Sequence, residues 1–552
     1  MANERKLKGR SAPGRRRKGL TAARATHELE ELNRIGMALS ETRDVEQLLT
    51  LILKKAREIT GADAGSLYLV EQENKNSSGS YSAGKRQLRF KLTQNDSVEF
   101  PYSEHTMEIA ESSMAGYCAL HGEVIELADA YRIPKSRPFK FNSRYDEQAG
   151  YRTRSLLTLP MKNGKGEVLG VLQLINCKRN PKGQLKDAGA VRRGVHAFPE
   201  RAVRLGLSLA SQAAVAYENS RLYRDIENLF DGFVNAAVKA IEQRDPTTSG
   251  HSQRVCEMTM ALAEAVDRET SGYYGELRFS REQMKELRYA ALLHDFGKVG
   301  VREEVLVKAK KLYPLQFERL MDRFDYIRRD IEAKIAEQKV EALLTLARKD
   351  ASARLHKLDE EAGRLLAEVE RYAQFVAKVN EPTILPAGEF EILAEIGRKT
   401  YRDSRGAERP YITADETRLL SIPRGSLDAE ERRQIEAHVV NSFIFLTQIP
   451  WTREFSSIPD IARAHHEKLN GKGYPYGLNG EQIPVQAKMM TICDIYDALS
   501  ASDRPYKRAV PTDRALDILK MCVKEEEIDP ELFRLFVEAQ VYRLVGKQEQ
   551  SA

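Results

Sequence analysis

The segment HHEKLNGKGYP, residues 465–475, places two adjacent histidines and a glutamate shortly before a Gly-Tyr-Pro turn. Imidazole and carboxylate groups bind metal ions, whereas glycine and proline favour turns. On its own the segment also fits a histidine-bearing helix end followed by a glycine-rich loop. Which of the two it is depends on the groups that the rest of the chain supplies.

A chain of 552 residues is too long for one hydrophobic core, so two or three domains are expected. The content of 42% hydrophobic and 30% charged residues is typical of globular proteins, and no apolar run is long enough to predict a membrane-spanning helix. The five cysteines form no CxxC pair, and the N-terminus lacks the apolar core of a secretion signal. We therefore expect reduced thiols in a cytoplasmic protein.

The net charge of +6 is concentrated at the N-terminus. Residues 1–25 contain nine Lys or Arg and one Glu, a charge of +8, which leaves −2 for the remainder of the chain. This composition predicts a disordered basic tail. Such a tail can be solvated or can touch anionic lipid or nucleic acid, and we expect no stable nucleic-acid complex.

Residues 26–220 have the pattern of an α+β domain. A helical pattern runs from 26 to 60 and ends at Gly61, and AGSLYLVEQ and RQLRFKLTQ read as strands. Two more strands flank a Gly-containing turn in RSLLTLPMKNGKGEVLGVLQLINCKR, and a helix follows from about 199 to 228. A helix–sheet–helix unit of this kind presents a pocket on one face of its sheet.

The segments SMAGYCALHGEVIELADAY, YDEQAGYRTRSLLTLP and VLGVLQLIN resemble those of a GAF domain, over roughly residues 30–220. GAF domains are small-molecule sensory modules, and some of them bind cyclic nucleotides. The resemblance implies a ligand near Ser113, Phe141, Asp146 and Thr153. A GAF-like fold used only for dimerisation fits as well, so no ligand is assigned.

The C-terminal half is expected to be all α-helical. Helical patterns cover 251–268, 281–295, 314–348, 352–378, 428–448, 458–468, 486–501 and 512–521. Two amphipathic patterns between 315 and 378 predict long helices that form an antiparallel hairpin or a dimerising coiled coil, with the bend near Lys349 and Asp350. Nothing catalytic appears in these two helices, so we expect a structural or interaction role.

Seven metal-capable residues recur in apolar or histidine-rich contexts of this half: His251, His294, Asp295, His438, His465, His466 and Asp494. Asp295 follows YAALLH, and Asp494 lies within MMTICDIYDAL, so both carboxylates are expected to be buried. A buried charge is costly unless it is compensated, and metal coordination is one of the few good compensations. A single buried histidine fits an ordinary core residue, but five with two acids favour a metal site.

Imidazole and carboxylate ligands suit first-row transition metals such as iron, manganese or zinc. Seven candidate ligands with a carboxylate that can be shared favour a binuclear centre. Two ions about 3.5–4 Å apart activate a bridging water and stabilise an in-line phosphoryl displacement. Lys298, Arg504 and Lys507 add positive charge suited to a phosphodiester, although each alone also fits an exposed salt bridge.

With HDFGK at 294–298 and HHEKLNGKGYP at 465–475, the sequence closely resembles an HD-GYP domain. This branch of the HD metal-dependent phosphohydrolases hydrolyses cyclic di-GMP. The resemblance covers about 225–308 and 418–515, and it implies two divalent transition metal ions, iron or manganese. It implies that His251, His294, Asp295 and Asp494 hold one ion, and that His438, His465 and His466 hold the second, with Asp295 bridging.

The resemblance also implies roles around the metals. Asp295 and Lys298 would be catalytic, and Lys298, Arg504 and Lys507 match positions that contact substrate phosphate. Adjacent histidines on one helix diverge by about 100°, so His466 is expected to bind more loosely or to touch substrate. The remaining expectations are that Glu467 orients a histidine, Gly471 ends a helix, Gly473 lets the backbone approach a phosphate, and Tyr474 offers its ring or hydroxyl to the ligand.

Three departures from the family pattern stand out. Thr247 replaces a residue that is usually tyrosine or, in some members, an acidic ligand, which favours two metals over three. Val439 and Ser442 replace the proline and glycine that usually follow the middle histidine. His294 and His438 lie 144 residues apart, much further than in the family, so a long insertion separates them.

The sequence thus predicts a tail (1–25), a GAF-like domain (26–220), an HD-GYP domain (221–308 and 418–547) and a helical insertion (309–417). The expected protein is a bacterial signalling phosphodiesterase that hydrolyses cyclic di-GMP to pGpG or GMP as a homodimer. Its GAF domain would regulate it through the helix near 220–240. A catalytically weak module that binds a ligand or partner, and the same chemistry on another cyclic dinucleotide, remain alternatives. The insertion would cap the site, mediate dimerisation or recruit a partner.

Overall fold

The computed structural model describes residues 30, 32–42, 44–72, 85–99, 103–245, 250–501 and 509–544. The predicted basic tail, Thr247, Arg504 and Lys507 lie outside these residues. The chain forms two compact units, Met1–Phe230 and Asp231–Ala552. In the described part, none of the helices has the length and apolar character needed to cross a membrane. All five cysteines are unpaired.

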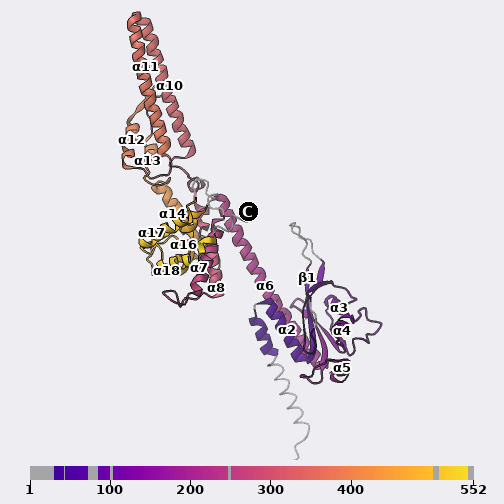
Figure 1. The fold of residues 1–552 in the computed structure, drawn as a ribbon. Coiled ribbons are helices and arrows are strands. Elements are labelled where there is room, and N and C mark those ends of the chain that lie inside the picture. The colour runs from indigo at the N-terminus through magenta and orange to yellow at the C-terminus, as the bar shows by residue number, and fades with distance from the viewer. Residues whose placement is uncertain are drawn as a thin grey trace, which may run out of the picture. The chain divides into compact units, whose positions relative to one another are not determined.

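The first unit is built on an antiparallel sheet with strand order β3-β2-β1-β6-β5-β4, in which β7 also pairs with β6 (Figure 1). The strands are β1 (Ala62–Gln72), β2 (Arg86–Asn95), β3 (His105–Glu108), β4 (Ile125–Leu127), β5 (Leu156–Lys162), β6 (Val168–Lys178) and β7 (Val195–His196). The helices are α2 (Val45–Thr60), α3 (Met114–His121), α4 (Arg144–Ala149), α5 (Ala188–Gly194) and α6 (Glu200–Arg244), and residues 32–41 are also helical. The four strands expected from the sequence are confirmed.

Side chains that alternate along the strands separate two hydrophobic cores. Leu172 and Leu174 of β6 pack with residues of α2 and α6 on one face, whereas Val171 packs with residues of α3 on the other. Gly61 ends α2 in the left-handed conformation at φ 73°, as predicted. The helix predicted over 26–60 is interrupted, because the Asp44 carboxylate accepts a hydrogen bond from the Gln47 N–H and starts α2 afresh.

In the described residues of the second unit the regular structure is helical, apart from a short hairpin of β8 (Thr400–Arg402) and β9 (Glu408–Pro410) and an isolated bridge between Asn470 and Asn479. Before and within the insertion it contains α7 (His251–Arg268), α8 (Arg281–Leu293), η2 (Phe296–Gly300), α9 (Glu303–Leu306), α10 (Pro314–Thr345), α11 (Arg348–Val379), α12 (Ala387–Arg398) and α13 (Ala414–Leu420). After the insertion follow α14 (Ala429–Leu446), η3 (Arg453–Phe455), α15 (Ile458–Arg463), α16 (Val485–Ser500), α17 (Thr512–Lys524), α18 (Pro530–Glu538) and η4 (Val541–Leu544). The predicted fold class, an α+β domain followed by a helical domain with an inserted hairpin, is confirmed.

The helices α10 and α11 lie side by side as an antiparallel hairpin (Figure 1). An ion pair of 2.9 Å joins Arg328 of α10 to Glu370 of α11. The bend lies near Lys349 and Asp350, as predicted, although these two residues already belong to the first turn of α11. The chain turns at 346–347, where both residues take extended conformations with ψ near 150°.

The insertion has a hydrophobic core of its own at the base of this hairpin. Residues of α10 and α11 pack there with residues of α12 and α13: Leu320, Phe324, Ile327, Val369, Tyr372, Val376, Leu393, Ile396, Leu419 and Leu420. Near the tip of the hairpin, by contrast, Val340, Leu343 and Leu344 are exposed. The large buried rings of Phe324 and Tyr372 thus belong to the core at the base of the hairpin.

The insertion is tied to α14 by buried polar contacts. The Lys308 ammonium contacts both carboxylate oxygens of Glu431 at 2.7 Å, and the Tyr313 hydroxyl donates to the same carboxylate at 2.8 Å. The Ser426 hydroxyl donates to the Lys308 carbonyl at 2.9 Å. Because Glu431 also completes the capping box of α14, the root of the insertion is bonded to the helix that carries His438.

We expect the substitution Phe324→Ala to lower the free energy of unfolding of the insertion by about 3–5 kcal/mol, because a large buried ring is lost and leaves a cavity. Backbone hydrogen exchange across residues 312–422 measures the change. Leu344→Ala is the matched control at an exposed position of the same helix, and it should change the free energy by no more than about 0.5 kcal/mol. Equal protection in both variants would contradict a core at the hairpin base.

Candidate metal centre

The seven residues predicted as metal ligands converge from five parts of the helical unit. His251 opens α7, His294 and Asp295 follow α8, His438 lies on α14, His465 and His466 follow α15, and Asp494 lies on α16. Six of the seven are buried, and the His466 side chain is 26% exposed. The structure therefore brings together groups that are as far as 243 positions apart in the sequence.

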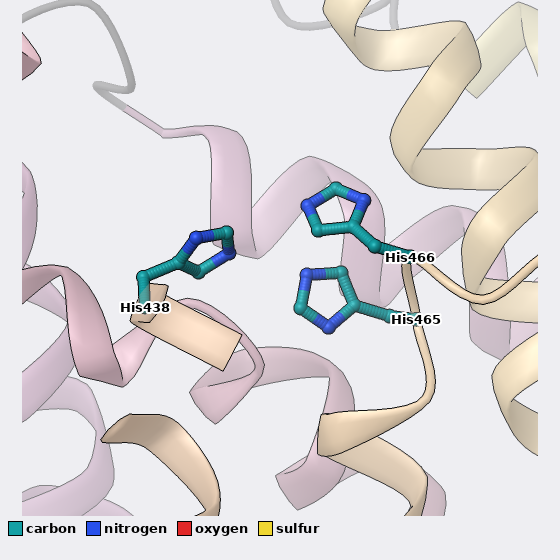
Figure 2. A group of neighbouring side chains, drawn as sticks. All are labelled: His438, His465 and His466. Atoms are coloured by element: carbon teal, nitrogen blue, oxygen red, sulfur yellow. The ribbon is translucent and has the colours of Figure 1, made fainter. Parts of the chain in front are cut away.

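Potential ligand atoms form three overlapping groups. His438, His465 and His466 form one group, and Figure 2 shows their rings turned toward one another. His251, His294 and Asp494 form a second group, and Asp295 joins His294 and His465 in a third. Within each group the ligand atoms lie within 4.8 Å of one another. The first group is one of the two ligand sets that the sequence implies, and the second group contains three of the four members of the other set. The fourth member, Asp295, lies close to both groups, 3.2 Å from His438 and 3.6 Å from His251.

Three of these histidines are held in the same way. The Nδ1 atoms of His294, His438 and His465 lie 2.7, 2.6 and 2.5 Å from the carbonyl oxygens of Ala291, Ile435 and Ala462, each three residues earlier. A carbonyl oxygen only accepts, so each Nδ1 carries a proton and donates it. In a neutral imidazole the opposite atom, Nε2, is then an unprotonated lone pair.

These three Nε2 atoms are buried and have no hydrogen-bond partner among the described residues. The Nε2 atom of His438 lies 3.2 Å from Oδ1 of Asp295, and the Nε2 atom of His294 lies 3.4 Å from Oδ2 of the same carboxylate. Acceptors thus face acceptors in a buried space, which costs about 1–3 kcal/mol for each group left unsatisfied. A divalent cation accepts lone pairs from all of them, and this mixture of nitrogen and oxygen donors fits a first-row transition metal.

Burial also keeps the adjacent histidines neutral. It holds the pKa of His465 well below its usual range and lowers the pKa of His466 to about 4. Both rings are therefore unprotonated at neutral pH, which is the form in which imidazole binds a metal.

His251 lies in a more acidic environment. Its Nε2 atom is 3.2 Å from Oδ1 of Asp494 and 3.6 Å from Oδ2 of Asp295, and its Nδ1 atom is 2.7 Å from Oδ2 of Asp497. Burial opposes the charged imidazole, but the hydrogen bonds with Asp494 and Asp497 outweigh it and raise the pKa to about 9. Asp494 responds in the opposite direction: burial would raise its pKa, but the bond with His251 and the nearby histidines hold it far below its usual range.

Asp497 is a residue of the site that the sequence reasoning missed. It is fully buried, and besides His251 it binds Arg254, whose Nε donates to Oδ1 at 2.7 Å and whose Nη2 donates to Oδ2 at 3.1 Å. A carboxylate behind a metal-binding imidazole fixes the orientation of the ring. The signal was present in CDIYDAL, because positions three apart on a helix share a face, which places Asp497 beside Asp494.

Lys298 is engaged with the carboxylates of the site. Its Nζ atom lies 2.9 Å from Oδ2 of Asp295 and 3.3 Å from Oδ2 of Asp245. Burial disfavours the ammonium, but the charges of Asp295 and Asp245 outweigh it and raise the pKa. The group therefore remains a cation beside the Asp295 carboxylate.

The geometry of the histidine pair differs from the prediction. The helix expected over 458–468 ends at Arg463, so His465 and His466 lie in a turn and not on one helix. The expected divergence of about 100° therefore does not apply, and the ring centroids lie 4.0 Å apart. The turn is held by the Thr491 hydroxyl, which donates to the His465 carbonyl at 2.8 Å.

The loop that follows this turn also differs from the prediction. Glu467 contacts the loop and not a histidine: its carboxylate accepts from the backbone N–H groups of Tyr476 at 2.8 Å and Leu478 at 2.9 Å. Gly473 packs against backbone of its own loop, where an added Cβ would lie 2.4 Å from the Lys468 nitrogen. The Tyr474 ring lies 4.8 Å from the His466 ring.

Ser442, one of the departures from the family pattern, joins two parts of the site. Its hydroxyl donates to the His294 carbonyl at 2.7 Å and accepts from the Gly297 N–H at 2.8 Å. Glycine is required at 297, because an added Cβ would lie 1.9 Å from the His438 carbonyl oxygen. Ser442 thus fastens α14 to the turn after the His294–Asp295 pair.

A second candidate site lies in the first unit. A cavity of about 520 Å³ on the α3 face of the sheet is lined by all four residues predicted to surround a ligand: Ser113, Phe141, Asp146 and Thr153. The Asp146 carboxylate already accepts three hydrogen bonds within the protein, from the Tyr131 hydroxyl at 2.9 Å and from the Thr153 N–H and hydroxyl at 2.7 and 2.8 Å. This carboxylate closes the loop over the cavity, while the aromatic rings of Tyr68, Phe90 and Phe141 provide apolar walls.

Comparison with known families agrees with the division of the chain into two units. Residues 44–217 match the GAF domain model, and residues 248–379 and 415–532 match models of the HD domain. The chain therefore carries a GAF domain followed by an HD domain, as the sequence predicted. HD domains are metal-dependent, in keeping with the buried histidine and aspartate groups described above.

Three curated relatives share parts of the sequence. A 3'3'-cGAMP-specific phosphodiesterase of Vibrio cholerae is 42% identical over 115 residues, which are 21% of this chain and 24% of the relative. A cyclic di-GMP phosphodiesterase of Pseudomonas aeruginosa is 33% identical over 160 residues, 29% of this chain and 34% of the relative. A cyclic di-GMP phosphodiesterase response regulator of Xanthomonas campestris is 51% identical over 59 residues, 11% of this chain and 15% of the relative. The chain thus spans about a third or less of the length of these relatives.

We expect Ser442→Ala to destabilise the helical unit by about 1–3 kcal/mol, because the buried His294 carbonyl and Gly297 N–H lose their shared partner. Trp451 is the single tryptophan of the chain and belongs to this unit, so its fluorescence during denaturation reports the change. Ser456→Ala, at an exposed position, is the control and should stay within about 0.5 kcal/mol of the wild type. If both variants unfolded alike, the bridging role of Ser442 would be wrong.

Proposed function

We propose that the helical unit is a metal-dependent phosphodiesterase that hydrolyses cyclic di-GMP to pGpG or GMP, in a cytoplasmic homodimer whose GAF domain regulates the activity. The observation that carries the proposal is the set of three buried Nε2 lone pairs around the Asp295 carboxylate, which calls for cations at this point. The named activities of the relatives from Vibrio, Pseudomonas and Xanthomonas support a cyclic dinucleotide as the substrate.

The two ligand groups would hold two divalent ions, iron or manganese. His251, His294 and Asp494 would bind one ion and His438, His465 and His466 the other, with Asp295 shared between them. When bound, such a pair of ions lowers the pKa of water and neutralises charge on a phosphodiester. The protein contributes rings that are already oriented by backbone carbonyls and by Asp497.

Residues around the metal ligands would position the substrate. Lys298 keeps its positive charge beside Asp295, where it neutralises charge near a bound phosphate. Burial, with a further contribution from Asp494, raises the pKa of Tyr474, so its hydroxyl stays protonated and can donate to a phosphate or a base. The Tyr474 ring beside His466 would form one wall of the substrate site. Gly473, Arg504 and Lys507 remain proposed substrate contacts on the strength of the sequence alone.

The GAF domain would act as the regulatory part. Its cavity of about 520 Å³ has the size and apolar lining suited to a small molecule. The helix α6 begins at Glu200, next to the GAF core, and ends at Arg244, whose guanidinium donates to the carbonyls of Val299 and Val301. Val299 is next to Lys298 in η2 and Val301 directly follows η2, so α6 ends against the turn that carries Lys298.

Turnover of cyclic di-GMP tests the substrate. We expect the purified chain of 552 residues, loaded with iron or manganese, to convert cyclic di-GMP to pGpG or GMP, as measured by chromatography of the products. A parallel assay with 3'3'-cGAMP is needed, because a relative with that specificity shares 42% identity over 115 residues. Faster conversion of 3'3'-cGAMP would reassign the substrate. Absence of turnover with both would favour the catalytically weak binding module.

The substitution Asp295→Asn tests the metal centre. Removal of a group that only hydrogen-bonds a metal ligand lowers the metal affinity by roughly 10–100-fold. Because Asp295 is proposed as a direct ligand of both ions, Asp295→Asn should lower the metal affinity by more than that. Metal content per chain and turnover are measured on the same sample. Asp460→Asn, an exposed position on α15, is the control and should retain both. Full metal content in the Asp295 variant would contradict its proposed position between two ions.

A further inference from the structure

The tip of the α10–α11 hairpin, residues 338–358, carries exposed apolar side chains. Val340, Leu343 and Leu344 of α10 are 55%, 60% and 81% exposed, and Leu346 in the turn is 44% exposed. Every residue from 343 to 350 is exposed. The tip lies away from the core at the base of the hairpin (Figure 1), so that core does not cover these side chains. Large apolar side chains that are exposed together indicate an interaction surface.

The positive charge of the hairpin is concentrated at the same end. The tip contains five Lys or Arg and two acids, a charge of +3. The rest of the two helices, residues 314–337 and 359–379, forms the shaft of the hairpin and contains eight Lys or Arg and eleven acids, a charge of −3. The hairpin therefore has a basic tip on an acidic shaft.

The cations of the shaft and of the tip also differ in their partners. Arg328, Arg329 and Lys334 of the shaft each form an ion pair with a carboxylate of the hairpin. At the tip, Lys339 is paired with Asp359. The other four cations of the tip form no ion pair with a carboxylate of the described residues: Arg348, Lys349, Arg354 and Lys357. Free cations next to exposed leucines suit a partner that is both anionic and apolar.

The order of these side chains along the hairpin matches the layers of a lipid surface. The leucines occupy the end of α10 and the turn, and Arg348 and Lys349 belong to the first turn of α11. Arg354 and Lys357 follow about 9 and 14 Å further along α11. In a bilayer the acyl chains lie beneath the charged headgroups, and long basic side chains reach from an apolar boundary to those headgroups.

The start of α11 favours anions as well. Its N-cap residue, Ala347, makes no side-chain hydrogen bond to the first N–H groups of the helix. The N-terminal end of a helix dipole attracts negative charge and disfavours the cations that Arg348 and Lys349 place there. Anionic headgroups at this point would satisfy both the helix end and the two cations. A protein partner would need an apolar recess with an acidic rim, whereas an anionic bilayer offers both properties over its whole surface.

We propose that the hairpin tip docks on a membrane surface that contains anionic lipid. Leu343, Leu344 and Leu346 enter the boundary between headgroups and acyl chains, and the four unpaired cations contact the headgroups. The proposal concerns the insertion alone and stands apart from the proposed catalytic activity.

Co-sedimentation of the purified chain of 552 residues with vesicles tests the docking. We expect binding to vesicles of phosphatidylcholine with phosphatidylglycerol, and weaker binding to vesicles of phosphatidylcholine alone. Leu344→Ser with Leu346→Ser should lower the partition coefficient about tenfold or more, because apolar area no longer leaves water. Arg348→Gln with Lys349→Gln should lower it about fivefold for each charge removed.

Two control variants carry the same changes outside the tip. Leu315→Ser with Ile384→Ser alters exposed apolar positions elsewhere in the insertion, and Arg329→Gln with Lys334→Gln removes two exposed charges from the shaft. Both should bind vesicles like the wild type. Circular dichroism confirms that each variant is folded.

The basic segment 1–25 is the same in every variant, so binding through that segment alone would leave the tip variants equal to the wild type. That result would overturn the proposal. Equal binding to neutral vesicles would overturn the role of the cations. A wild type that binds neither kind of vesicle would overturn the proposal and point to an acidic protein surface as the partner.

A fluorescent probe tests the depth of the leucines. Leu344→Cys, labelled with an environment-sensitive dye, should shift its emission to shorter wavelength with the anionic vesicles, whereas labelled Leu315→Cys should not. The wild type, in which four of the five cysteines are buried, is labelled alongside to show any background. Vesicle binding without a shift at position 344 would overturn the contact between the leucines and the acyl chains.

Discussion

The helical unit depends on a buried carboxylate that faces unprotonated imidazole nitrogens. Asp295 lies within 3.6 Å of ring nitrogens of His251, His294 and His438, and the last two of these rings have their proton fixed on the far side. Lone pairs that face each other in a low dielectric repel; the ammonium of Lys298 lies beside Oδ2 of the carboxylate, whereas Nε2 of His438 faces Oδ1. Because the histidines arrive from different helices, the same cations that complete the site would also hold α7, α8 and α14 together, so that metal binding contributes to folding.

Much of this arrangement was predictable from local pattern. A His-Asp pair at the end of the apolar run YAALL, and an acid that follows MMTIC, are enough to indicate buried charge. The ends of α7 and the stop of α2 at Gly61 followed from periodicity and from a residue that adopts positive φ. The strands of the GAF sheet could also be predicted from periodicity. Side chains alternate along β1 and β6 between two faces that pack against different cores.

What escaped prediction depends on contacts between distant segments. The His465–His466 turn is held by Thr491, 26 residues after His465, so helical periodicity extended the preceding helix too far. In the sequence, Ser442 was noted only as a replacement of the glycine that is usual in the family. Its hydroxyl in fact joins the Gly297 N–H and the His294 carbonyl, 145 and 148 residues away. Glu467 was assigned to a histidine, yet it folds the loop after it. In each case a polar side chain finds a backbone partner that no local pattern specifies.

The root of the insertion has a consequence for how such a chain can change. Lys308, Glu431 and Ser426 hold the two ends of the inserted segment against each other, whatever lies between them. The entropy cost of closing a loop grows only with the logarithm of its length, so a segment of more than a hundred residues costs little more there than a short one. With these contacts intact, a change in the length or content of the insertion leaves α14, and with it His438, in place.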